Sequence, residues 1–194
     1  MGGEKTTVKD VHKGAGAMAN ERQQAGIRTF FLPMTINDST GNVFCLFSQS
    51  QVVEILGPRP IQQIPYSPPY LKGVLHYDDR LLPVISLDDL CDQKQKERQG
   101  RYRQLVVIRT GAVNPVTGEP LKAVVTANVR VRIAKLSGQE LTTAFVEREA
   151  PPSLRDSGAL RGFFQRHGDF VAVFDLGPVV QGTFEQRLGE AIHC

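Results

Sequence analysis

The fold of this chain is decided by a stretch that occurs twice, as LKGVLHYDDRLLPVISL at residues 71–87 and as LRGFFQRHGDFVAVFDL at residues 160–176. The copies align without a gap, so glycine and most apolar residues recur at matching places and Lys72 matches Arg161. Each copy has the pattern of an apolar strand, a polar turn and a second apolar strand. The turns contain Asp, His and Gly, which tolerate left-handed backbone angles or bond their own main chain. Because an internal repeat fixes the architecture, we predict two related all-β lobes with a groove between them.

Short apolar runs separated by turn residues continue on both sides of the repeat. We expect strands at residues 29–32, 42–47, 51–56, 104–109 and 121–133. Residues 87–99 begin with two aspartates near their start, as the N-terminus of a helix prefers, and residues 182–192 are expected to form another short helix. Residues 1–26 are mostly small and polar, so we expect a disordered extension there. Many short strands of this kind are typical of barrels and sandwiches.

The composition argues against several classes of protein. Of the 194 residues 41% are hydrophobic, and no apolar run approaches the ~20 residues that span a bilayer. The chain starts without the apolar stretch of a secretory signal, so we expect a cytoplasmic protein. Cys45, Cys91 and Cys194 lack the spacing of a metal or redox motif, and idle, buried thiols are expected. Since no nucleophile-elbow or zinc-binding pattern is present, we expect no catalytic residue, no metal and no cofactor.

Two other classes of function stay open at this point. Arg130 and Arg132 alternate with apolar residues, which is typical of a half-buried strand with a solvated face. The alternative is a small β-barrel nucleic-acid-binding protein in which these arginines and Lys135 grip phosphates. A net charge of only +3 and the lack of interleaved aromatic residues make this the second choice. A hydrolase whose nucleophile and base lie far apart in sequence is the third.

The order and spacing of several fragments resemble the CheW family, the adaptors of bacterial chemosensory arrays. Residues 73–87 are similar to that family's Gly-Val-Ile-Asn-Leu-Arg-Gly-x-x-x-Pro-Val-Ile-Asp-Leu. Upstream, residues 52–55 match the family's Val-x-Glu-Ile, and residues 64–65 match the segment just before its repeat. The resemblance extends over residues 28–181.

The resemblance implies a mainly β fold with two SH3-like five-stranded β-barrel subdomains, short helices and a hydrophobic groove. It places the CheW-like domain at residues 27–181, between the N-terminal extension and a C-terminal short helix or tail at 182–194. The family has no catalytic activity and links the cytoplasmic tip of a chemoreceptor to the regulatory domain of the histidine kinase CheA. We therefore predict a non-enzymatic adaptor that binds a CheA-like regulatory domain and a receptor tip, with no nucleic acid and no membrane insertion.

The candidate partner-binding residues lie in the best-matching part of the chain and are Val52, Glu54, Gly73, His76, Asp78 and Arg80. In the family, a Glu at the Glu54 position pairs with an Arg at the Asp78 position, whereas this chain has a second acid there. Two carboxylates at that distance repel rather than pair, and we hypothesise that Arg80 reaches Glu54 or Asp78 instead. We predict a divergent member with an altered partner, in an alternative pathway such as one that controls pili.

Overall fold

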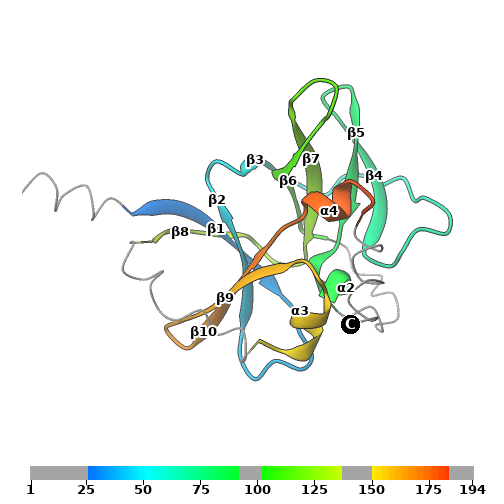
Figure 1. Cartoon of the computed structure of the whole chain (residues 1–194). Helices are drawn as coiled ribbons and strands as arrows, with labels where there is room; N and C mark the ends of the chain where they lie inside the picture. Colours follow the sequence, from blue (N-terminus) through cyan, green and yellow to red (C-terminus); the bar gives the residue numbers. More distant parts are fainter. Residues whose placement is uncertain (1–25, 92–101, 137–149, 184–194) are drawn as a thin grey trace, which may run out of the picture.

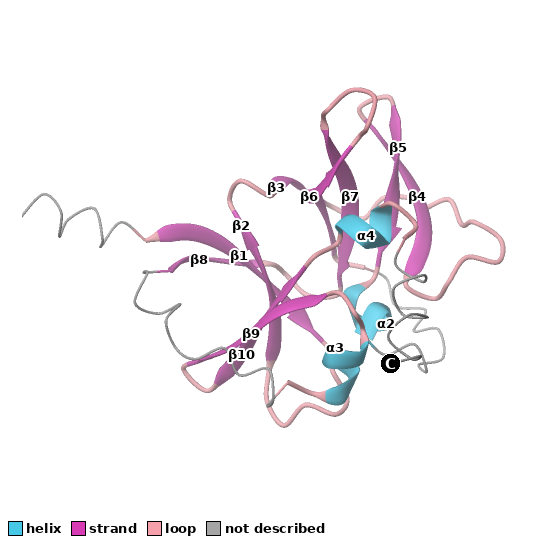
Figure 2. Cartoon of the chain, in the orientation of Figure 1, coloured by secondary structure: helices cyan, strands magenta, loops and turns pink. Residues whose placement is uncertain are grey.

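The computed structural model describes residues 26–91, 102–136 and 150–183. Its strands form two five-stranded sheets with the orders β8-β1-β2-β10-β9 (sheet A) and β3-β6-β7-β5-β4 (sheet B). Sheet A contains β1 (Ile27–Met34), β2 (Val43–Ser48), β8 (Arg132–Leu136), β9 (Leu160–Arg166) and β10 (Asp169–Phe174). Sheet B contains β3 (Val52–Leu56), β4 (Leu71–Tyr77), β5 (Arg80–Ile85), β6 (Gln104–Val113) and β7 (Pro120–Ala127). The two sheets lie side by side, with short helices near the place where they meet (Figures 1 and 2).

The two repeat copies form the β4–β5 and β9–β10 hairpins, one in each sheet. In both sheets the second hairpin strand pairs in parallel with its neighbour, β5 with β7 and β10 with β2. An antiparallel strand follows in each, then an edge strand, β3 in sheet B and β8 in sheet A. The predicted pair of related all-β lobes is thus confirmed. Within the described residues no ladder joins the first and last strand of either sheet, so both sheets are open.

Both duplicated turns have left-handed backbones. Asp78 and Asp79 have φ angles of 46° and 56°, and His167 and Gly168 have 50° and 85°. Positive φ at both central residues is the requirement of a two-residue turn that follows the twist of the strands. Gly73 has a φ of 134° at a register shift of β4, and a Cβ at this position would overlap the Gln62 carbonyl oxygen. This glycine is required by both its conformation and the close approach of another segment.

Apolar side chains fill three clusters, because each sheet is covered on both faces. The largest lies between the sheets and joins Phe47 of sheet A with Val106 of sheet B. A second lies on the other face of sheet B around Val107, and a third on the other face of sheet A around Phe31. Consecutive residues of one strand therefore point into different cores, which explains why residues 105–108 are all buried instead of alternating.

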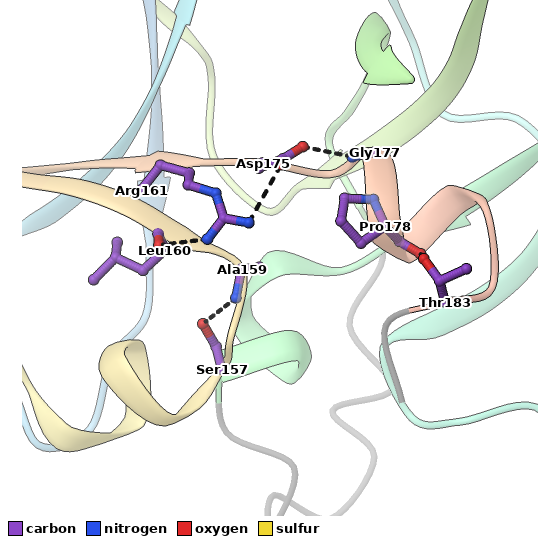
Figure 3. Close-up of polar contacts among 8 residues, drawn as sticks. All are labelled: Ser157, Ala159, Leu160, Arg161, Asp175, Gly177, Pro178 and Thr183. Carbon is purple, nitrogen blue, oxygen red and sulfur yellow. Dashed lines mark hydrogen bonds and ion pairs between the residues drawn. The ribbon is translucent and has the colours of Figure 1, made fainter. Parts of the chain in front are cut away.

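A short helix follows each hairpin. Helix α2 (Leu87–Cys91) follows β5, and the Ser86 Oγ accepts a hydrogen bond from the Asp89 amide at 3.3 Å. Helix α4 (Gly177–Val180) follows β10, and the Asp175 carboxylate accepts a hydrogen bond from the Gly177 amide at 3.0 Å (Figure 3). Side-chain oxygens thus hold the first amides of both helices.

The matching cations of the repeat also have matching roles. Lys72 Nζ lies 3.1 Å from Asp89 Oδ2, and both side chains are largely buried. Arg161 Nη2 lies 3.4 Å from Asp175 Oδ2 in a more exposed pair, in which the carboxylate faces the guanidinium on one side and the start of α4 on the other (Figure 3). In each lobe a basic residue of the first hairpin strand therefore fixes an acid close to the start of the following helix.

The predicted strand over residues 121–133 is wrong in extent. It is two strands in different sheets: β7 ends at Ala127 in sheet B, and β8 begins at Arg132 in sheet A. Residues 128–131 carry the chain from one sheet to the other and belong to no strand. A run of strand-forming residues does not show on its own where the chain changes sheets.

The helix predictions are only partly tested. Residues 87–91 form α2, but residues 92–101 lie outside the described residues. Of the expected helix over 182–192, Gly182 and Thr183 are described and are not helical, and the rest lies outside. Two helices were missed, α4 and α3 (Pro152–Asp156), and both have proline in the first turn, where its missing N–H costs nothing.

The expected burial of the thiols is confirmed for two of the three cysteines. Cys45 and Cys91 are both buried, and burial, with a smaller contribution from Cys91, raises the pKa of the Cys45 thiol. Cys194 and the expected disordered extension, apart from Gly26, lie outside the described residues. In the described part of the chain, no helix is long and apolar enough to cross a bilayer.

Candidate functional site

A hollow of about 370 Å³ lies at the turn end of the first repeat copy; we call it the sheet B hollow. Its lining residues come from β4, β5, β6, β7 and the turns next to them and are Tyr77, Asp78, Arg80, Leu82, Arg109, Glu119, Pro120 and Lys122. Two of the predicted site residues, Asp78 and Arg80, are among them. The twist and pairing of sheet B bring the ends of these strands together, although they are far apart in sequence.

A hydrogen bond between opposite edges of sheet B brings a third predicted residue to this hollow. The Tyr77 hydroxyl, at the end of β4, donates to Glu54 Oε2 on β3 at 2.9 Å. This hydrogen bond, followed by burial and the charges of Asp78 and Glu54, raises the pKa of Tyr77, and Arg59 opposes them. Because β3 and β4 are the two edge strands, this hydrogen bond joins side chains from opposite edges of sheet B.

The hypothesis that Arg80 reaches Glu54 or Asp78 is wrong. Arg80 Nη1 lies 3.0 Å from Glu119 Oε2, across the hollow, and both side chains are more than half exposed. Glu54 is satisfied by the neutral Tyr77 phenol, so two acids are tolerated here without a bridging guanidinium. The hypothesis was based on short separation in sequence, but the acid that lies within reach of Arg80 is Glu119, which strand pairing brings close.

The remaining basic side chains of the hollow are positioned by their surroundings. Arg109 Nη1 donates to the Ser50 carbonyl at 2.9 Å, and Lys122 Nζ lies 5.7 Å from the centre of the Tyr77 ring. The face thus combines an aromatic ring with acidic and basic groups in an exposed, shallow setting. Such a surface is suited to docking another macromolecule, with charge deciding which partner fits.

The other predicted site residues do not gather at the hollow. Val52 is partly buried and packs against the core between the sheets. Gly73 is buried against the Gln62 main chain, which gives it a structural role. His76 is exposed, and since it lies between the buried Leu75 and Tyr77 on a strand, its side chain points to the opposite face.

Besides Leu82 and Pro120, sequence reasoning missed four polar residues of the hollow, Tyr77, Arg109, Glu119 and Lys122. Tyr77 carried a usable signal: an aromatic residue with a hydroxyl, on the inward-facing register of β4, beside an acidic turn. The other three come from β6, β7 and the turn between them. No local pattern marks them, because only strand pairing places them near the hairpin.

The basic stripe behind the nucleic-acid alternative does not form. Arg130 precedes β8 and is in no strand, whereas Arg132 lies over the Phe44 ring at 5.1 Å. Lys135 is exposed on β8 and lies opposite Arg28 of β1. Residues 102–136 therefore present no continuous row of cations along one strand. Across the described ranges, no group of three or more His, Cys, Asp or Glu side chains is arranged to hold a metal.

Comparisons with known proteins agree with this geometry. A family model described as "CheW-like domain" matches residues 34–184. Among solved structures, the fold is similar to the crystal structure of the scaffolding protein TtCheW from Thermoanaerobacter tengcongensis, with a TM-score of 0.55. That match covers 79% of this chain and 87% of the other at 13% sequence identity. No curated protein matched the sequence.

Proposed function

The chain belongs to the CheW-like domain family, and from this premise we propose that it is a non-enzymatic adaptor that couples a chemoreceptor to a CheA-type histidine kinase. The match over residues 34–184 is the observation that carries the proposal. The proposed partners are the regulatory domain of a CheA-like kinase and the cytoplasmic tip of a receptor, which would place the protein in the cytoplasm.

The sheet B hollow is the proposed docking surface for one of these partners. Support comes from the position of Glu54, Asp78 and Arg80 around Tyr77, and from the exposure of the charged groups on its rim. We further propose that each lobe is an SH3-like barrel. The contact between Tyr77 and Glu54, which links the two edges of sheet B, supports a nearly closed sheet.

The acid at Asp78 argues for an altered partner. It adds negative charge to a rim on which Arg80 is already paired with Glu119. A partner with a basic residue at the facing position is therefore favoured, and one adapted to an arginine here is disfavoured. This charge pattern is the reason for proposing a pathway apart from the ordinary array, such as one that controls pili.

The proposal is tested by measuring binding of the full chain to the regulatory domain of a CheA-like kinase from an ordinary array and from an alternative pathway. We expect Asp78→Arg to strengthen binding to the ordinary partner by about tenfold, the size of one well-placed charge pair. Isothermal titration calorimetry at low salt measures the change.

The matched control is Asp79→Arg, which makes the same charge change in the same turn at a residue that does not line the hollow. It should alter the affinity much less. Equal affinities for Asp78→Arg and the unchanged chain would show that the docking surface lies elsewhere. Absence of binding to either kinase domain would remove the adaptor proposal itself.

A further inference from the structure

Sheet A has a hollow of its own at the place that corresponds to the sheet B hollow. It measures about 130 Å³ and is lined by Phe31, Phe44, Arg132, Ala134, Arg166, His167, Asp169 and Val171. The repeat alignment matches Tyr77 with Arg166 and Asp78 with His167, so the equivalent turns border both hollows. We call this second cavity the sheet A hollow.

The strand registers also show what corresponds to Glu54. In sheet B, Glu54 lies opposite Val107 of the neighbouring strand β6. In sheet A, Arg132 lies opposite Phe31 of the neighbouring strand β1. Both neighbouring strands are fourth in their sheets, counted from the first strand of the duplicated hairpin.

Val107 and Phe31 occupy equivalent positions, which is seen by tracing the strand pairing from each of them to the duplicated hairpin. Val107 lies opposite Val124, which lies opposite Val84 of the hairpin. Phe31 lies opposite Leu46, and the preceding residue Cys45 lies opposite Ala172. The repeat matches Val84 with Val173, the residue after Ala172. Leu46, the residue after Cys45, therefore corresponds to Val124, and Phe31 corresponds to Val107. Arg132 therefore corresponds to Glu54.

The two lobes thus differ in the pair that faces across the curl of the sheet. Sheet B has a carboxylate and a phenol joined by a hydrogen bond, whereas sheet A has two guanidiniums, Arg132 and Arg166, at the same two positions. Two cations cannot bond to each other. Both can donate to one carboxylate, which accepts paired N–H groups from arginine.

Aromatic rings hold both guanidiniums beside this hollow. Arg132 Cζ lies 5.1 Å from the centre of the Phe44 ring, and Arg166 Cζ lies 5.4 Å from that of Phe31. The two rings contact each other edge to face with centroids 6.3 Å apart. The arginines are therefore pre-positioned on one apolar floor, which lowers the entropy lost on binding.

We propose that the sheet A hollow binds the carboxylate side chain of a glutamate or aspartate in an extended acidic segment of a partner protein. The volume suits one side chain, since it equals the share of about four water molecules. Ile133, which follows Arg132 on the edge strand β8, is 49% exposed and provides apolar contact for a residue beside the acid. The partner segment therefore has an apolar residue next to its acid.

A carboxylate fits this hollow better than a phosphate group. Asp169 also lines the hollow and is held by the Asn42 side chain, whose Nδ2 donates to Asp169 Oδ1 at 2.9 Å. This fixed negative charge opposes a dianion more strongly than a monoanion. The proposal concerns the lobe opposite the sheet B hollow, so it does not depend on the proposed function.

The test is an NMR titration of the full chain with the peptide acetyl-Leu-Glu-Leu-amide, its Gln counterpart and inorganic phosphate. We expect the Glu peptide to shift the amide signals of residues around the sheet A hollow and to bind about tenfold more tightly than the Gln peptide. Arg132→Gln and Arg166→Gln should each remove most of this preference, and Arg132→Lys should reduce it because lysine lacks the planar fork.

Arg130→Gln is the matched control, since it removes the same charge two residues before Arg132 without touching the hollow. It should leave the preference for Glu unchanged. Dispersed spectra of each variant show that it has folded. The proposal is overturned by equal binding of the Glu and Gln peptides, by tighter binding of phosphate, or by shifts confined to sheet B.

Discussion

At the scale of single residues, the lobe of sheet B satisfies the acid Glu54 with a neutral phenol instead of a cation. Glu54 receives a hydrogen bond from Tyr77, the residue just before Asp78. A phenol brings no charge, so the rim keeps the negative charge of Asp78 for a partner. The same two positions in the other lobe carry Arg132 and Arg166. One duplicated scaffold therefore carries different polar groups at two equivalent positions.

The raised pKa of Tyr77 leads to a prediction about alkaline stability. A pKa above the unfolded value of 10.0 means that Tyr77 contributes stability below pH 10, which is lost as pH rises through its folded pKa. We expect the free energy of unfolding to fall more steeply above pH 10 in the unchanged chain than in Tyr77→Phe, by at most about 1.4 kcal/mol per pH unit. Urea unfolding at several pH values measures both slopes.

Tyr102 provides the control, because burial followed by the charges of Asp89 and Asp88 raises its pKa to about 12. It titrates in both proteins and cancels in the comparison. Identical slopes for Tyr77→Phe and the unchanged chain would contradict the hydrogen bond to Glu54 as the cause. Glu54→Ala should move the onset of tyrosinate absorbance to lower pH, since it removes the acceptor of the hydrogen bond that is the first cause of the raised pKa.

At the scale of elements, the two hairpins share a pattern but differ in what their matching glycines allow. Gly73 has a positive φ and lies against the main chain of Gln62, which cannot move without breaking its two hydrogen bonds with Val74. Gly162 is matched to it in sequence, yet its nearest neighbour is the Phe164 ring. A ring can rotate away at lower cost than a hydrogen-bonded main chain.

Alanine substitutions should therefore separate the two glycines. We expect Gly73→Ala to lower the free energy of unfolding by about 3 kcal/mol or more, because strain and overlap combine. Gly162→Ala should cost less, about 1 kcal/mol. Gly57→Ala is the control, because no atom lies within 4 Å of its added Cβ and it should be nearly neutral. Urea unfolding measures all three, and equal losses for Gly73 and Gly162 would contradict the argument.

At the scale of the whole molecule, the lobes are joined by the core between them. This cluster combines buried side chains of both sheets, including Phe47 and Val106. Strands β1 and β2 precede the first hairpin in sequence but belong to the sheet of the second. The strands of sheet B form one continuous stretch between β2 and β8, so the lobe of sheet A is interrupted in sequence and the two lobes share buried surface.

We expect the two lobes to unfold in one cooperative step. Val106→Ala should lower the free energy of unfolding by roughly 2 kcal/mol, from two lost methyl groups and the cavity they leave. Native-state hydrogen exchange should show the same loss of protection in the slowest amides of β2 and β7, although Val106 belongs to sheet B. A loss confined to β7 would mean that the lobes unfold separately.

The sequence by itself determined the features that follow local patterns. The duplicated strand-turn-strand segment predicted both hairpins, their left-handed turns and the presence of two lobes. A glycine inside a strand pattern is typical of a bend, a bulge or a close approach of the backbone, and Gly73 lies at a register shift and against the Gln62 main chain. Matches of spacing pointed to the family, and two of the six candidate residues, Asp78 and Arg80, line one hollow, while Glu54 accepts a hydrogen bond from Tyr77 of that hollow.

Only the tertiary structure decided which side chains face one another. The contacts that matter join residues far apart in the chain. They are the pair of Arg80 with Glu119, the hydrogen bond from Tyr77 to Glu54, and the two arginines over Phe31 and Phe44. Strand pairing and the curl of each sheet set these contacts, and neither is encoded in the spacing of any single segment. The physical reason is that hairpins arise from interactions between neighbours in sequence, whereas surface chemistry arises from neighbours in space.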